Sequence, residues 1–232
     1  MSTPTPARRR SSSLSLAALV ATGSAVLALA LAGGHAAQGH SGHAAHVNRS
    51  GPAAQHLALH DEMRRLWEDH ITWTRLFIVS ASDDLADKQA TTQRLLDNQQ
   101  HIGDAIKPFY GDAAGERLTS LLREHIVVAA NLLAAAKSGD QAGVERETSA
   151  WYRNADQIAD FLHGANPRHW ERSEMRSMMR EHLDLTLAEA VAHLQHDFGA
   201  DIAAYDEIHR QILSMADMLS DGIVAQFPKR FR

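Results

Sequence analysis

The chain has 232 residues, a formal net charge of −5 and no cysteine. The lack of cysteine excludes disulfide bonds, thiolate metal sites and a lipid-modified cysteine anchor. Residues 1–37 contain three arginines and no acidic residue, so the chain without them has 20 basic and 28 acidic residues and a net charge of −8. An acidic protein of this kind is not expected to bind nucleic acid or an anionic membrane surface.

Residues 1–37 are typical of a signal peptide. Arg8, Arg9 and Arg10 are followed by an uncharged stretch from Leu14 to Ala32, and small residues suited to cleavage come next. The stretch is also long enough to span a bilayer, so an uncleaved membrane anchor is the alternative. Either interpretation predicts an extracytoplasmic protein, secreted or tethered to the outer face of the membrane, with no other membrane contact.

Residues 38–56 are rich in Gly, Ala, Ser and His and contain too little apolar surface to fold, which predicts a flexible tether. Histidines on a flexible segment can bind Zn, Ni or Cu(II) without a fixed geometry, or can simply be solvated. The histidines of this segment are His40, His43, His46 and His56.

From residue 57 onward the apolar residues recur with helical spacing, and no alternating strand pattern is present. Gly and Pro separate six predicted helices. Short loops predict three antiparallel hairpins in one all-α helical bundle over residues 57–227, followed by a tail at 228–232. The predicted helices are 57–82, 86–107, 112–137, 141–163, 171–195 and 200–226.

A histidine lies at the centre of the apolar face of the first helix in each predicted hairpin. His70, His125 and His182 are separated by 55 and 57 residues, and each follows an acidic residue. A carboxamide comes 28, 29 and 29 residues later, and residues equidistant from a hairpin turn lie level with each other. We therefore expect an internal repeat that pairs each imidazole with an amide inside the core, the amides being Asn98, Asn154 and Gln211.

Three aspartates repeat with the same period but lie opposite the apolar stripes of their helices. They are expected to face solvent or a neighbouring hairpin and are not counted as ligands. These residues are Asp104, Asp160 and Asp217.

A metal site is the first interpretation of the polar layer, because inward-facing imidazoles from several helices are how metal sites in helical bundles are built. Glu189 and His193 lie on the same helical face as His182. Imidazole and carboxylate without thiolate suit Zn, Fe, Mn or Ni. Amides that hydrogen-bond the imidazoles would orient them. The predicted ligands are His70, His125, His182, Glu189 and His193, and the predicted orienting amides are Asn98, Asn154 and Gln211.

Two other interpretations stay open. A neutral imidazole bonded to an amide can serve only to fix the register between helices, in a structural or interaction protein. The histidines and Glu189 could also act in general acid–base catalysis. However, the sequence has no nucleophile elbow, phosphate-binding loop or dinucleotide fingerprint, which favours a protein that binds a metal ion or small ligand over an enzyme.

Residues 63–227 resemble a family of exported bacterial all-helical proteins. The resemblance is carried by the segments LWEDHITWTRLFI, WYRNADQIADFL and REHLDLTLAEAVAHL. Some members carry glycosyltransferase or acetylglutamate-kinase labels, so the resemblance implies a transferase as an alternative function. Those enzymes are built on α/β sheets with phosphate-binding loops, and neither feature is present in this sequence. The resemblance implies an exported all-α fold and assigns no catalytic residue.

Overall fold

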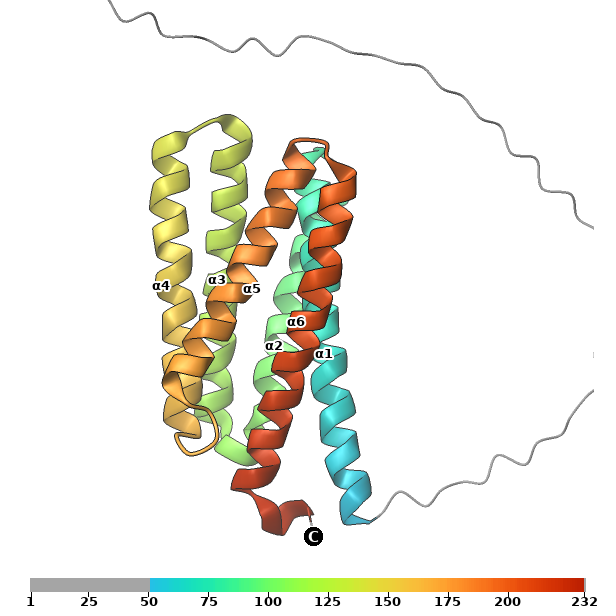
Figure 1. Ribbon diagram of the computed structural model, residues 1–232, viewed down its shortest axis with the longest axis vertical. Coiled ribbons are helices and arrows are strands. Elements are labelled where there is room, and N and C mark those ends of the chain that lie inside the picture. Colours follow the sequence, from blue (N-terminus) through green and yellow to red (C-terminus); the bar gives the residue numbers. More distant parts are fainter. Residues whose placement is uncertain (1–50, 232) are drawn as a thin grey trace, which may run out of the picture. The chain divides into compact units, whose positions relative to one another are not determined.

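The computed structural model describes residues 51–231, which form six α-helices and one short 3₁₀ helix and contain no strand (Figure 1). The prediction of an all-α helical bundle is confirmed. The predicted signal peptide and the tether up to residue 50 lie outside the described residues. The helices are α1 Pro52–Ser82, α2 Lys88–Tyr110, α3 Asp112–Ser138, α4 Gln141–Ala165, α5 Arg172–Leu194, α6 Phe198–Gln226 and η1 Pro228–Phe231.

The helices run alternately up and down, and each packs against the next one in the chain. Helix α6 packs against α1 and closes the bundle, while α5 runs obliquely from α4 towards α1 (Figure 1). Helices α2 and α3, which belong to different predicted hairpins, also pack along each other extensively. The finer prediction, that the bundle is arranged as three repeated hairpins, is therefore not confirmed, since α2 and α3 pack as closely as the helices within each predicted hairpin.

Two helix ends differ from the prediction. Helix α1 begins at Pro52 and includes the last part of the predicted tether, because proline suits the first turn of a helix, where its missing N–H is not needed. The sequence predicts that the second helix ends at residue 107, before Pro108, which is wrong, since α2 continues to Tyr110. Pro108 leaves the carbonyl of Asp104, an exposed residue, without its helical donor, and the chain turns at Gly111, where φ is 85°.

The repeated aspartates lie outside the core, as predicted, and two of them connect neighbouring helices. Asp160 accepts bonds from Arg176 of α5 at 2.7 and 3.0 Å, and Asp217 pairs with Arg64 of α1. Asp104 contacts Lys107 and Gln100 of its own helix. Exposed pairs of this kind stabilise a fold by at most about 1 kcal/mol each. They align the helices without forming a site.

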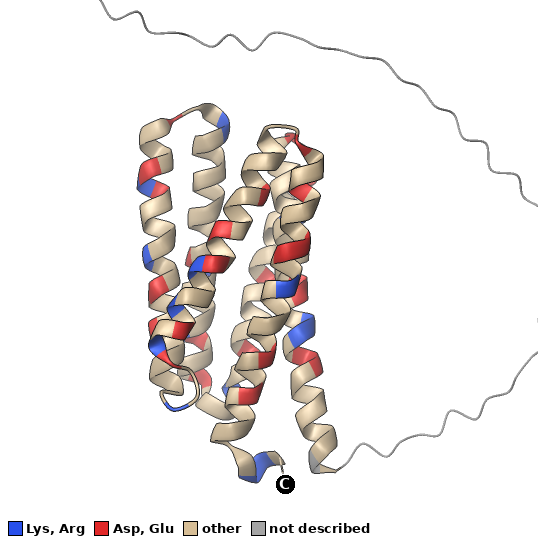
Figure 2. Ribbon diagram, viewed as in Figure 1, with Lys and Arg blue, Asp and Glu red and all other residues tan. Residues whose placement is uncertain are grey.

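The second half of α3 contains the longest uncharged stretch of the described helices. No Lys, Arg, Asp or Glu lies between Glu124 and Lys137, and Figure 2 shows this stretch of α3 without charge up to the Lys137 at its tip. Among the described helices, α3 is the one long and apolar enough to cross a membrane, and half of its most apolar window is buried inside the bundle. Its apolar residues line the core and the cavity described below.

Gly222 of α6 is a packing constraint on the fold. A Cβ atom at this position would overlap the indole of Trp170, which is buried in the core. We expect Gly222→Ala to lower the free energy of unfolding by about 2 kcal/mol, the usual cost of overpacking a core. Urea denaturation measures the change.

Gly164→Ala is the matched control, because an added Cβ at this exposed helical position meets nothing within 4 Å. It should be neutral or stabilise by up to about 1 kcal/mol through helix propensity. Equal effects of the two substitutions would contradict the close packing of Trp170 on Gly222.

Candidate functional site

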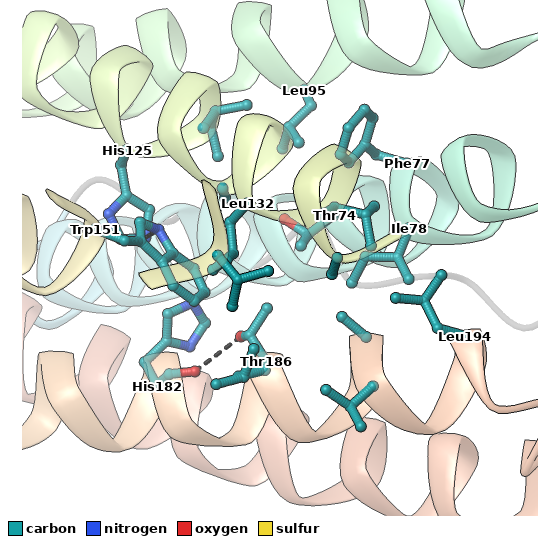
Figure 3. A pocket seen from close by; sticks show the side chains of 18 of the residues that line it. Thr74, Phe77, Ile78, Leu95, His125, Leu132, Trp151, His182, Thr186 and Leu194 are labelled. Atoms are coloured by element: carbon teal, nitrogen blue, oxygen red, sulfur yellow. Dashed lines mark hydrogen bonds between the residues drawn. The ribbon is translucent and has the colours of Figure 1, made fainter. Parts of the chain in front are cut away.

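A cavity of about 120 Å³ lies inside the bundle, between α1, α3 and α5 with contributions from α2 and α4. One end is formed by the three repeated histidines and Trp151, and the rest is lined almost entirely by apolar side chains. Figure 3 shows His125 and His182 at one end and Phe77, Ile78 and Leu194 at the other.

The cavity also reaches the surface of the bundle. Val191 and Ala136 line it, and both are exposed, Val191 by 40 %. A small molecule can therefore enter between α3 and α5.

The three histidines come together at this cavity, although they belong to different helices. Each is only 3 % exposed, and the ring centroids of His70 and His182 are 5.7 Å apart. Burial lowers the pKa of His125 to about 3 and that of His182 to about 4. Burial and the two neighbouring histidines lower the pKa of His70 well below its ordinary value of 6.5. All three imidazoles are therefore neutral at pH 7.

The imidazole of His125 has both of its nitrogen atoms occupied. Its Nδ1 bonds the Asn154 side-chain oxygen at 2.8 Å, and its Nε2 accepts a bond from the indole N–H of Trp151 at 3.1 Å. The amide nitrogen of Asn154 donates to the carbonyl of Leu121, which fixes the direction of the amide. His125 is thus a satisfied core histidine that forms one wall of the cavity.

His182 has the same environment on one side of its ring. Its Nδ1 bonds the side-chain oxygen of Gln211 at 3.2 Å, and the amide nitrogen of Gln211 donates to the carbonyl of Met178 at 3.1 Å. The predicted pairing of His125 with Asn154 and of His182 with Gln211 is therefore confirmed. Within residues 51–231, no side chain hydrogen-bonds Nε2 of His182, and this edge of the ring lies at the cavity.

His70 departs from the expected pairing. The expected neighbour Asn98 donates to the carbonyl of Leu66, as its counterparts do, but the contact with Nδ1 of His70 is made by the amide nitrogen of Gln99 at 3.2 Å. That nitrogen also donates to the side-chain oxygen of Asn98 and to the carbonyl of Leu95. The direct pairing of His70 with Asn98 was thus a wrong prediction, because Gln99 lies between them.

The five predicted metal ligands fall into two clusters. His70, His125 and His182 line the cavity, whereas Glu189 and His193 bind the guanidinium of Arg75 and the carboxylate of Asp201. In the part of the chain that the structure describes, no group of three or more His, Asp or Glu side chains is arranged to hold a metal ion. Metal binding stays a prediction from the sequence.

The second cluster is a buried ion network at the junction of α1, α5 and α6. Arg75 donates to Glu189 and to Asp201, each at 2.6 Å, and His193 contacts Asp201 at 3.0 Å and Asp83 at 3.4 Å. Burial raises the pKa of Glu189 to about 7, against the opposing effect of Arg75. Burial would also raise the pKa of Asp201, but bonds from Arg75 and His193 keep it below its ordinary value.

Sequence reasoning missed three polar residues of these clusters. Gln99 lies about 40° from the centre of the stripe formed by Leu95, Ile102 and Ile106, closer than Asn98, so its angular position was a usable signal. Asp201 lies in the first turn of α6, where an acidic residue is ordinarily explained by the helix dipole. Arg75 is off the histidine face of α1, and no pattern in the sequence pointed to it.

The chain matches no known protein-family model, no curated protein and no solved structure. The interpretation of the site therefore depends on its geometry.

The neutral histidines make stability dependent on pH. In the unfolded chain each imidazole takes up a proton near pH 6.5, whereas in the fold His125 and His182 stay neutral down to about pH 3 and 4, and His70 behaves alike. Stability is then complete above about pH 6.5 and falls as the pH drops towards 4. Glu189 acts in the opposite sense, because its folded pKa of about 7 lies above its ordinary 4.5.

We expect a net uptake of about two protons on unfolding, and hence a fall in the free energy of unfolding of about 2.7 kcal/mol per pH unit between pH 6 and 5. Urea denaturation at pH 7, 6 and 5 measures it. Glu189→Gln should raise the proton uptake on unfolding to about three and so make the fall steeper. His182→Gln should lower the uptake to about one and make the fall shallower. A free energy that does not change over this range would contradict the buried neutral layer.

Proposed function

We propose that this protein binds a small, uncharged and largely apolar molecule in the cavity between α1, α3 and α5. The observation that carries the proposal is an apolar cavity of about 120 Å³ that reaches the surface and has unbonded imidazole edges at its inner end. A concave, mostly apolar site with a few convergent polar groups is the usual form of a small-molecule site. The function is binding, without a chemical step.

The size of the cavity limits the ligand. An apolar cavity of about 150 Å³ holds a molecule as large as benzene, so the ligand fits as a single ring or a short branched chain. Phe77, Leu132 and Leu194 contact such a group without polar competition. A longer ligand would extend past Val191 to the surface.

The charge of the site also limits the ligand. Every imidazole at the cavity is neutral because of burial, and no Lys, Arg, Asp or Glu lines the cavity. A carboxylate or an ammonium group would lose its hydration there without an opposite charge to replace it, at a cost of several kcal/mol. An uncharged ligand avoids this loss.

The other functions expected from the sequence, including the transferase alternative, stay predictions. A metal function is tested by elemental analysis of the full chain purified without added metal, before and after addition of Zn, Mn, Fe or Ni. A purely structural role of the layer has its own support in the contact that each of Asn98, Asn154 and Gln211 makes with the backbone carbonyl of the opposite helix. That role predicts a stable bundle that binds no small molecule.

The extracytoplasmic location indicated by residues 1–37 likewise stays a proposal.

Filling the cavity tests the proposal. Ala129 of α3 lines the cavity, so Ala129→Leu should occupy the space of the ligand. We expect the full chain to bind toluene with a Kd of about 0.1–1 mM, the affinity typical of a ligand with this number of atoms. Ala129→Leu should weaken binding at least tenfold. Calorimetric titration or ligand-detected NMR provides the measurement.

Ala134→Leu is the control, because Ala134 lies on the exposed side of the same helix and does not line the cavity. It should leave toluene binding unchanged. Toluene that binds Ala129→Leu equally well would refute the cavity as the binding site, as would an unsubstituted chain that binds no neutral single-ring compound.

A further inference from the structure

We propose that the ligand carries a neutral hydroxyl group, of the phenol or alcohol class, which bridges His70 and His182 at the inner end of the cavity. This inference rests on the proposed function and adds the chemical class of the ligand. It follows from the hydrogen bonds on the far side of each ring, which place the ring protons of the two histidines on opposite atoms.

His182 presents an acceptor to the cavity. The amide nitrogen of Gln211 donates to the carbonyl of Met178, so its oxygen must face Nδ1 of His182. That nitrogen therefore carries the ring proton and donates it to the amide oxygen. Because a neutral imidazole has a single N–H, Nε2 of His182 is a bare acceptor at the cavity.

His70 presents a donor. The amide of Asn98 is fixed by its bond to the carbonyl of Leu66, which turns its oxygen towards Gln99. The amide nitrogen of Gln99 faces this oxygen and the carbonyl of Leu95, and its third neighbour at 3.2 Å is Nδ1 of His70. Nδ1 of His70 cannot direct a proton at an amide nitrogen, so it is bare and the ring proton is on Nε2.

One departure from the internal repeat creates this difference. Gln99 occupies the position that Ala155 and Ile212 occupy in the other two repeats, and all three side chains are fully buried. Where the residue is apolar, the amide oxygen of the preceding residue reaches the imidazole directly. Where it is glutamine, an amide nitrogen reaches the imidazole and reverses its tautomer. The first repeat thus supplies a donor and the third supplies an acceptor.

A hydroxyl group is the simplest partner for this pair, because it accepts from His70 Nε2–H and donates to His182 Nε2 with one oxygen atom. The two ring centroids are 5.7 Å apart, and the proposal requires both Nε2 atoms to lie within about 3 Å of one ligand oxygen atom. An ether or a ketone satisfies only His70. A metal ion at the cavity needs an unprotonated nitrogen from each ring. The unprotonated nitrogen of His70 is Nδ1, which faces Gln99. The pair therefore selects a hydroxyl.

Binding of matched ring compounds to the full chain tests the class. Phenol, anisole and toluene share one ring and differ in the group that faces the histidines. We expect phenol to bind at least tenfold more tightly than either of the others, because only phenol satisfies both imidazoles. Equal affinities for phenol and toluene would overturn the hydroxyl inference and leave the proposed function standing. Binding of none of the three would overturn both.

The tautomers can be observed directly in the unliganded protein. Long-range ¹H–¹⁵N correlation spectra of the histidine rings distinguish a protonated Nδ1 from a protonated Nε2. We expect a protonated Nε2 in His70 and a protonated Nδ1 in His125 and His182. The same tautomer in His70 and His182 would overturn the inference whatever the binding data show.

Gln99→Leu tests the origin of the difference, since it gives the first repeat an apolar residue as in the others. We expect the proton of His70 to move to Nδ1 and the preference for phenol over toluene to fall below threefold, with toluene affinity kept. Gln89→Leu, on the exposed side of the same helix, is the control and should change neither. An unchanged tautomer and phenol preference in Gln99→Leu would refute the role of Gln99.

Discussion

The rest of the structure depends on the burial of three neutral imidazoles in the centre of an apolar bundle. A buried imidazole is tolerated only if it remains uncharged and its N–H finds an acceptor. The bundle meets this requirement with a side-chain amide that bonds the ring of His125 or His182 and also donates to a backbone carbonyl one helical turn before the histidine. The amide thus joins the two helices and fixes their relative register, and the same bonds decide which ring atom faces the cavity.

The cavity follows from the same arrangement. The planar rings of His70, His125 and His182 line its inner end, and the ring centroids of His70 and His182 are 5.7 Å apart. Beyond them, small residues such as Ala129 and Ala190 line α3 and α5, so the helices do not fill the space as they do elsewhere in the core. The histidine layer can therefore have both a structural and a binding role. The ring edges that face the cavity are different from the ring edges that bond the amides and set the register of the helices.

The network around Arg75 has a different physical character. Its carboxylates, Glu189 and Asp201, are almost completely buried and are held by one guanidinium, so the network connects α1 to the α5–α6 end of the bundle through charge. Removing one member of such a network leaves an uncompensated buried charge, which is why it constrains the fold even where its net stabilisation is small. The histidine layer avoids this problem by remaining neutral. Within the Arg75 network, Glu189 responds to pH in the opposite direction to the histidine layer, because its pKa is raised by burial whereas those of the histidines are lowered.

The sequence by itself determined the six helices, the all-α class, the three buried histidines and two of the three imidazole–amide pairs. These features are local or periodic: apolar spacing defines each helical face, and equal distance from a turn places His125 level with Asn154 and His182 level with Gln211. Only the tertiary structure decided that the three histidines meet at one cavity, that Glu189 and His193 turn away to Arg75 and Asp201, and that Gln99 displaces Asn98 from His70. The physical reason is that helical periodicity gives the direction of a side chain to within one face. Which group on the neighbouring helices bonds a buried polar atom depends on differences in position smaller than the width of one residue.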